Sequence, residues 1–318
     1  MTPSQARLNL NPILTGMFRS VQQGNFIATQ LLSNLPQKLS ISQFGETGLE
    51  AFRRYNLSRA PGSNTKRINM VFKDKTFTLK QRAVDVPIDR ESIEESNYLQ
   101  YLNVQNYPEI SQFAVNTVSD VLALDYELDV ADMLKTPGVY PTGNVITLAP
   151  GQKWSDPASD PIADMDKARE IIRQKTGARA DTLTLGPTVE TILLRHPKIV
   201  AMLSHANDKI VTHEHLKRFF KVEKILVGDA IWADDGDVML DVWGNMALLS
   251  FSPAITVQTA SLMRAPFGMT SVKENHPFME KVRYDGDAKS WIYGGTYERM
   301  PNLTKPEAGV LFDQPIDL

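Results

Sequence analysis

Residues 53–82 read RRYNLSRAPGSNTKRINMVFKDKTFTLKQR and begin the stretch of sequence that decides the fold. They hold nine Lys or Arg against one acid, and residues 84–134 hold eleven Asp or Glu against one base. The whole chain of 318 residues nets only −3. A local field of one sign attracts a surface of the other sign, and a net charge near zero lets copies approach one another. We therefore expect a self-assembling protein in which a basic ribbon lies over an acidic helix of the next copy.

The residues predicted to make this contact between subunits form two groups. The basic group, in an extended hairpin, is Arg53, Arg54, Arg59, Lys66, Arg67, Lys73, Lys75, Lys80 and Arg82. The acidic group, expected on the exposed face of a long helix with no balancing base, is Asp120, Asp125, Glu127, Asp129 and Asp132. Acids in the last turns of a helix oppose its macrodipole, so we expect the neutralising charge to come from elsewhere.

The same basic segment has two other interpretations. It could be an ordinary solvated surface, because exposed ion pairs contribute only about 0–1 kcal/mol each. With Tyr55, Phe72 and Phe77 it could also bind single-stranded nucleic acid through backbone attraction and base stacking. The long acidic segment beside it favours the contact between subunits.

Composition narrows the function classes further. The chain has no cysteine, which excludes disulfides, thiolate metal sites and cysteine nucleophiles and suits a reducing compartment. Its first residues lack the pattern of a signal peptide, and no apolar run approaches the ~18 residues of a membrane helix. We expect an intracellularly made protein that does not contact a membrane. A pI near 6.0 argues against a chain whose main task is to coat nucleic acid.

The first half of the chain is predicted to be extended and then helical. Residues 1–40 are polar and resemble an arm that is tied down in places. Residues 41–86 are predicted to form a long hairpin that turns at Arg59-Ala60-Pro61-Gly62-Ser63, with Lys73-Asp74-Lys75 as an alternative turn. A helix is predicted over residues 108–134. Its apolar stripe is formed by Ile110, Phe113, Thr117, Val121, Leu124, Leu128 and Ala131.

The second half is predicted to be α/β and then all-β. Proline-rich residues 136–160 form a connector, and Asp160 caps a helix that Pro161 begins and Gly177 ends. A strand over 181–185, a helix after Gly186-Pro187, a helix that starts at Thr212 and a strand over 222–227 are expected to follow. Residues 238–251 are predicted to form a hairpin that turns at Gly244-Asn245, and Asp285-Gly286 marks another.

No motif for catalysis, cofactor or metal binding is convincing, so we predict no enzyme activity and no cofactor. The nucleophile elbow, the phosphate-binding loop, the dinucleotide fingerprint and the zinc-protease helix motif are all absent from the sequence. His213 and His215 sit at a helix start, where side chains two residues apart diverge, so a surface pair is favoured over a metal site. Residues 234–237 hold three Asp but lack the spacing of a calcium loop, which favours a solvated turn.

These blocks, in this order, resemble the major capsid proteins of tailed bacteriophages, which have the Hong Kong 97-type shell fold. Several stretches between residues 25 and 315 carry the resemblance. They are Trp154-Ser155-Asp156-Pro157 with Asp160-Pro161-Ile162-Ala163-Asp164-Met165, Thr176-Gly177, Thr182-Leu183-Thr184-Leu185-Gly186, Leu194-Arg195-His196-Pro197-Lys198-Ile199, and residues 219–230, FFKVEKILVGDA. No single stretch is specific, but the ordered set is.

The resemblance implies an α+β, Hong Kong 97-like fold with a defined domain plan. Residues 1–40 would be the N-terminal arm and 41–86 the extended hairpin called the E-loop. Residues 87–136 and 254–318 would form the peripheral domain, with its spine helix at 106–134, and 137–253 the axial domain. The implied function is that of a structural shell subunit, which forms hexamers and pentamers of an icosahedral shell enclosing double-stranded DNA.

The resemblance also implies partners and a location. Besides copies of itself, the chain would contact the packaged DNA without sequence specificity, and separate scaffold, portal and decoration proteins. It would be assembled in the host cytoplasm and reside in the virion. In one branch of the family, E-loop lysines are cross-linked to asparagines, but no partner asparagine can be aligned for Lys66, Lys73 or Lys75. An encapsulin-like compartment shell is the alternative, because it shares the fold and encloses protein instead of DNA.

Overall fold

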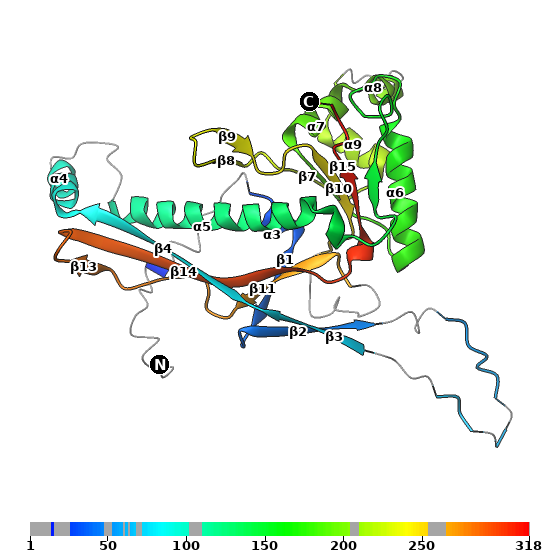
Figure 1. Ribbon diagram of the computed structural model, residues 1–318, viewed down its shortest axis with the longest axis horizontal. Helices are drawn as coiled ribbons and strands as arrows, with labels where there is room; N and C mark the ends of the chain where they lie inside the picture. The colour runs from blue at the N-terminus through cyan, green and yellow to red at the C-terminus, as the bar shows by residue number, and fades with distance from the viewer. Residues whose placement is uncertain are drawn as a thin grey trace.

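The computed structural model describes residues 14–15, 26–47, 53–59, 61–62, 64–67, 72–101, 110–203, 210–253 and 265–317 of the chain. Its central feature is helix α5 (Ile110–Lys135), which lies along a six-stranded sheet and reaches a five-stranded sheet at its C-terminal end (Figure 1). Two further ribbons, each of two strands, project from this frame. The mixture of helices and sheets agrees with the predicted α+β class.

The six-stranded sheet is built around β14 (Ser290–Leu303), a strand of 14 residues. It pairs antiparallel with β4, β11, β12 and β13, and β1 joins the edge by pairing parallel with β11. These strands are β1 (Ser33–Gln37), β4 (Lys80–Asp89), β11 (Gly268–Lys273), β12 (Phe278–Met279) and β13 (Arg283–Asp285). The pairing of Asp285 with Ser290 confirms the hairpin predicted at Asp285-Gly286.

Helix α5 packs closely on this sheet because its contact face is made of small and medium side chains. Ala114, Val115 and Val118 are fully buried against it. A Cβ atom on Gly295 of β14 would lie only 2.2 Å from a methyl carbon of Val118, so the strand approaches the helix as far as a glycine allows. With 26 residues at 1.5 Å each, α5 spans about 40 Å.

The apolar stripe predicted for α5 is only partly correct, because Ala131 is fully buried as expected but two other members are not. Phe113 and Val121 were expected in it, yet they are 56% and 46% exposed. The buried face instead contains Val118, Leu122 and Tyr126. Apolar residues occur on more than one side of this helix, and the sheet takes the side with the smaller residues. Residues 106–109 of the predicted spine helix lie outside the described residues.

The five-stranded sheet has the order β5-β15-β10-β6-β7. Its strands are β5 (Val145–Thr147), β6 (Thr182–Leu185), β7 (Lys224–Val227), β10 (Met246–Ser250) and β15 (Gly309–Asp313). The helices of this region are α6 (Pro161–Thr176), α7 (Pro187–Arg195), α8 (Pro197–Leu203) and α9 (His213–Phe220). The predicted signals at the ends of α6 are confirmed, because Asp160 accepts a hydrogen bond from the backbone N–H of Ala163 and Gly177 has a left-handed φ of 69°.

Alternating residues of β10 divide the core of this region into two layers. Ala247 and Leu249 pack with side chains of α6, α7 and α9 on one face of the sheet. Met246 and Leu248 pack on the other face with Tyr126, Val130 and Leu134 from the C-terminal half of α5. Helix α5 therefore belongs to both cores: its first half lies on the six-stranded sheet and its second half on the five-stranded one.

One strand assignment made from the sequence needs correction. No hairpin forms at Gly244-Asn245, because β9 (Met239–Asp241) pairs with β8 (Ile231–Ala233), whereas β10 pairs with β6 and β15. Every residue of β10 is buried and needs a neighbour on both sides, whereas β9 is exposed throughout. The last strand, β15, lies in the five-stranded sheet between β5 and β10.

The ribbon formed by the strands at 41–47 and 72–78 lies on the opposite side of the molecule from α6–α9 (Figure 1). After α3 (Ala28–Leu31), β1 ties the arm to the six-stranded sheet. The ribbon of β2 (Ile41–Thr47) and β3 (Phe72–Thr78) is antiparallel, as predicted, and a turn falls at Pro61-Gly62, where Gly62 has a φ of 84°. The alternative turn at residues 73–75 is wrong, because these residues lie inside β3.

Three short elements complete the description. Helix α4 (Arg90–Tyr101) follows β4, and the 3₁₀ turns η2 (Pro137–Val139) and η4 (Pro306–Ala308) come before β5 and β15 in the sequence. Within the part of the chain that the structure describes, no helix is long and apolar enough to cross a membrane.

Candidate functional site

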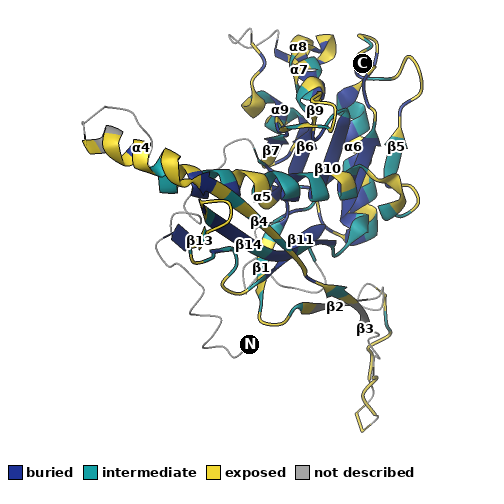
Figure 2. Ribbon diagram, turned by 60° about the vertical axis from the view of Figure 1, so that its left-hand side comes forward, coloured by how far each residue is buried: buried dark blue, intermediate teal, exposed yellow. Residues whose placement is uncertain are grey.

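The basic loop, which we define as residues 53–67 between β2 and β3, extends away from both sheets and is exposed (Figures 1 and 2). Its bases Arg53, Arg54, Arg59, Lys66 and Arg67 all face solvent. The two limbs of the loop touch each other: Arg59 donates a hydrogen bond to the Thr65 hydroxyl at 3.3 Å, and the Lys66 ammonium lies 5.8 Å from the centre of the Tyr55 ring. These contacts order the loop without reducing its positive charge.

The remaining predicted bases lie along the ribbon that carries this loop. Lys73 and Lys75 belong to β3 and Lys80 begins β4, where it is exposed. Arg82, the last of the group, lies further along β4 and faces helix α5. The structure thus brings five of the nine predicted bases together in the loop and separates Arg82 from them.

Arg82 neutralises two of the acids on α5 within the same chain. Its guanidinium donates to Asp125 at 2.8 Å and to both carboxylate oxygens of Asp129 at 2.8 and 3.0 Å. Burial raises the pKa of Asp125, and the adjacent guanidinium opposes that effect. Lys135 pairs with Asp132 at 3.2 Å. The expectation of an acidic face with no balancing base is therefore wrong, because the sequence pattern on α5 did not include a base from a neighbouring strand.

Glu127 is the second correction, because it is fully buried and not on an exposed face. Its carboxylate accepts hydrogen bonds from the backbone N–H groups of Ile27 and Ala28, both at 2.9 Å, and from the indole N–H of Trp243 at 2.7 Å. Burial raises the pKa of Glu127, while these three donors favour the ionised form. The residue fixes the N-terminal arm to α5 and to the segment between β9 and β10.

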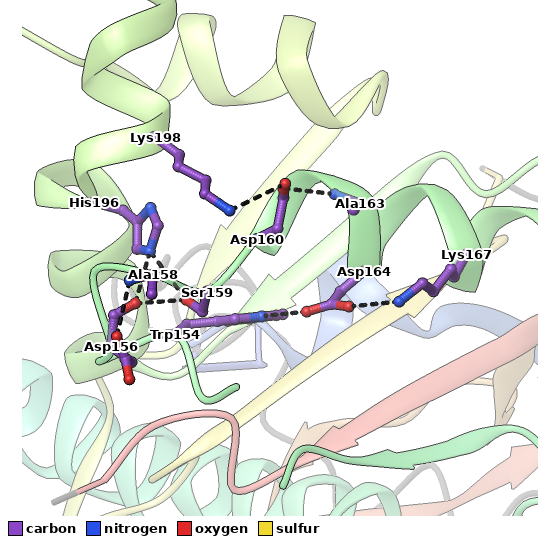
Figure 3. Close-up of polar contacts among 10 residues, drawn as sticks. All are labelled: Trp154, Asp156, Ala158, Ser159, Asp160, Ala163, Asp164, Lys167, His196 and Lys198. Carbon is purple, nitrogen blue, oxygen red and sulfur yellow. Dashed lines mark hydrogen bonds and ion pairs between the residues drawn. The ribbon is translucent and has the colours of Figure 1, made fainter. Parts of the chain in front are cut away.

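Two stretches that carried the family resemblance meet in the structure (Figure 3). The imidazole Nε2 of His196 lies 3.1 Å from the hydroxyl of Ser159 and 3.3 Å from the carbonyl oxygen of Asp156. Lys198 pairs with Asp160 at 3.3 Å, and the indole of Trp154 donates to Asp164 at 3.2 Å. Residues 154–164 are thereby tied to the turn between α7 and α8.

The Ser159 and His196 pair has the geometry of a structural contact. The Ser159 hydroxyl donates to the Asp156 carbonyl at 2.7 Å, and both Ser159 and His196 are buried. The other ring nitrogen of His196, Nδ1, has no hydrogen-bond partner among the described atoms, whereas a catalytic triad places an orienting carboxylate there. The arrangement positions a loop, and its residues lie inside the fold.

The residues considered for metal binding have other partners. His213 pairs with Glu190 at 2.6 Å, and the side chain of His215 forms a capping box with Thr212 at the start of α9. The Asp234 carboxylate accepts from the backbone N–H groups of Gly236 and Val238, which makes residues 234–237 the predicted turn. Among the described residues, no group of three or more His, Asp or Glu could hold a metal ion.

Comparison with known proteins identifies the fold and its relatives. No family model matches the chain. The major capsid protein of Burkholderia phage BcepMu is 29% identical over 307 residues, which are 95% of each chain. A crystal structure of a phage-related protein from Bordetella bronchiseptica RB50 is 30% identical, covers 97% of this chain and 98% of that one, and has a TM-score of 0.77. The capsid of cyanophage P-SCSP1u is 12% identical, with a TM-score of 0.58 over 92% of this chain and 89% of that one.

A long helix that bridges two sheets, an N-terminal arm and a projecting hairpin define a Hong Kong 97-type shell protein. With relatives at this level of identity over almost the whole length, the chain belongs to the family of bacteriophage major capsid proteins. The resemblance inferred from the sequence is thereby confirmed.

Proposed function

We propose that this chain assembles with copies of itself into hexamers and pentamers of an icosahedral shell that encloses double-stranded DNA, and that it has no enzymatic role. The single observation that supports self-assembly best is the basic loop, whose described residues carry five exposed bases and lie away from every core of their own chain. A segment of this kind contributes little to the folding of its own subunit, so its charge is available to a neighbour.

We propose domain boundaries that keep the strands of each sheet together. We propose that residues 1–40 are the arm, that 41–86 are the E-loop hairpin, and that α5 with the six-stranded sheet forms the peripheral domain. The five-stranded sheet with α6–α9 would be the axial domain around the hexamer and pentamer centres. Because β15 pairs in the five-stranded sheet, residues 309–313 join the axial domain in this proposal instead of the peripheral one.

The predicted contact between subunits is retained in a narrower form. The basic hairpin of one copy would lie against the acidic side of α5 in another, where Asp120 and Asp132 are exposed. Asp125 and Asp129 already hold Arg82, so a second base would have to share them. Glu127, being buried, is not part of the contact. The further partners would be portal, decoration and separate scaffold proteins, with assembly in the host cytoplasm and a final place in the virion.

The test is sedimentation velocity on the purified protein, with electron micrographs of the fast fraction. Closed particles or rings are expected, and DNA within particles recovered from infected cells would identify the cargo. The triple variant Arg59→Glu, Lys66→Glu, Arg67→Glu should remain folded and fail to assemble. A matched control reverses three exposed bases elsewhere, Arg218→Glu, Lys224→Glu, Lys281→Glu, and should assemble.

Salt provides an independent check on the same contact. Exposed charges are screened over about 8 Å at physiological ionic strength, so raised salt should slow early assembly of the wild type. Normal particles from the triple variant, or assembly that does not respond to salt, would show that the charge of the basic loop does not drive assembly.

A further inference from the structure

We define the β8–β9 hairpin as residues 229–241, which include both strands and the turn between them. This hairpin exposes several large apolar side chains to solvent. Ile231, Val238 and Met239 are 53%, 53% and 67% exposed. The register places Ile231, Ala233 and Met239 on one face, while the other face carries Trp232, which packs against the core shared with α5. A two-stranded ribbon is marginally stable in water, and clustered exposed apolar side chains mark interaction sites.

The hairpin is nevertheless held rigidly at both ends. At the tip, one carboxylate oxygen of Asp234 accepts hydrogen bonds from the backbone N–H groups of Gly236 and Val238, at 2.8 and 2.9 Å. At the base, the backbone N–H of Val242 donates to Ala230, and both residues are buried. A surface that is ordered before binding loses less entropy on association, which suits a docking site.

The charge of the hairpin has one sign. Asp229, Asp234, Asp235, Asp237 and Asp241 are its ionisable residues, and no Lys or Arg occurs between Lys224 and Arg264. None of these five acids forms an ion pair with another described residue. The surface therefore offers apolar side chains bordered by carboxylates that have no ion-pair partner among the described residues, and a complementary partner must offer apolar side chains bordered by bases.

One described segment of the chain has that composition, and it is the basic loop. Its five bases match the five acids of the hairpin in number, and residues 53–72 contain no acid. Leu57 is 69% exposed and lies between Arg54 and Arg59. The loop and the β8–β9 hairpin lie on opposite sides of the molecule in both views, so they cannot meet within one chain (Figures 1 and 2).

We propose that the β8–β9 hairpin is the docking site for the basic loop of a second copy. This inference rests on the proposed self-assembly and names the receiving surface. Leu57 would pack against the face of Ile231 and Met239, and the arginines beside it would approach the Asp residues. Because Lys135 donates to the carbonyl of Val242 at 2.9 Å, the hairpin base adjoins the end of α5. The loop would thus continue from the acidic side of α5 onto the hairpin.

The absence of cysteine allows a direct test by disulfide trapping, because every thiol is an introduced one. Leu57→Cys combined with Met239→Cys should give covalent dimers and longer oligomers when assembling protein is oxidised, and reductant should remove them. Two other cysteine pairs are controls for the position that receives Leu57. They combine Leu57→Cys with Phe113→Cys on α5 or with Tyr284→Cys on β13, and residues 113 and 284 are both exposed. Cross-linking to residue 113 or 284 but not to 239 would overturn the proposal.

A charge exchange tests the same contact without a covalent bond. Asp235→Lys, Asp241→Lys should slow assembly by about tenfold or more, and Arg54→Glu, Arg67→Glu should do the same. Combining all four changes should restore the rate, because the charges are complementary again. If the four changes together assemble no better than either pair alone, the docking site is wrong. Micrographs separate the two proposals: particles without residue 239 cross-links refute this contact and leave the shell, whereas wild-type protein that forms no particles even in infected cells refutes both.

Discussion

Glu127→Ala tests the anchor that fixes the N-terminal arm to α5. The substitution removes the acceptor for three N–H donors, those of Ile27, Ala28 and Trp243, all of which belong to buried residues. A buried donor left without a partner costs about 1–3 kcal/mol, so three cost about 3–9 kcal/mol if nothing relaxes. The space left by the side chain can admit water, and we therefore expect the lower part of that range, about 3–5 kcal/mol.

The assay is urea unfolding of the unassembled subunit, followed by tryptophan fluorescence because Trp243 lies in the anchor itself. Asp132→Ala is the matched control, since it removes an exposed acid of the same helix whose solvated ion pair with Lys135 contributes little, and it should change the free energy of unfolding by less than about 0.5 kcal/mol. The arm should also become accessible to protease in the Glu127→Ala variant. A cost below about 1 kcal/mol, equal to that of the control, would refute the account of the anchor.

The dependence of subunit stability on pH tests Glu127 in a second way. Burial raises the pKa of Glu127 above its usual 4.5, so the native state binds the proton more tightly than the unfolded chain does. Its contribution to stability is then fully present below pH 4.5 and is lost as the pH rises through the raised pKa. Glu127→Gln cannot titrate, so the stability of the wild type relative to this variant should fall across that window. A difference that rises with pH would contradict the sign.

Two further substitutions test local packing by urea unfolding. Asp160→Ala removes the N-cap of α6 and should cost about 1 kcal/mol, and a change near zero would mean that the hydrogen bond to Ala163 is not stabilising. Gly295→Ala places a Cβ 2.2 Å from Val118 and should cost about 1–3 kcal/mol through overpacking. Gly286→Ala, where nothing lies within 4 Å, is its control, and equal effects of the two would contradict the close approach of α5.

The elements that the sequence predicted correctly are those with local signals. Both ends of α6 were predicted from capping residues alone: Asp160 and Pro161 at its start and Gly177 at its end. The turn at Pro61-Gly62 followed from a proline φ and a glycine that accepts positive φ. In each case the determining atoms lie within a few residues of one another, so the pattern along the chain holds the necessary information.

The errors all depend on contacts between distant residues. The buried face of α5 is chosen by Gly295 of β14, and the residues that pair with β10 are 59 or more positions away in the sequence. Glu127 resembles any other acid on a helix until its donors from residues 27, 28 and 243 are known. Arg82 belongs to the basic block in sequence, yet the pairing of β4 with β14 brings it to α5.

The charges of the chain fall into two groups: those paired within the subunit and those left for a contact with another subunit. Arg82 and Lys135 neutralise acids of α5, so those charges stabilise the subunit itself. The basic loop and the β8–β9 hairpin each keep charges of one sign together, and a surface meant only for solubility would intermix the signs. Like charges repel within each segment, which costs the isolated subunit a little stability and is relieved only when the two segments meet. Added salt should therefore stabilise the free subunit slightly while it weakens the contact between subunits, because it screens the repulsion and the attraction alike. If these charges instead formed ion pairs within their own subunit, added salt would weaken the subunit and the contact between subunits together.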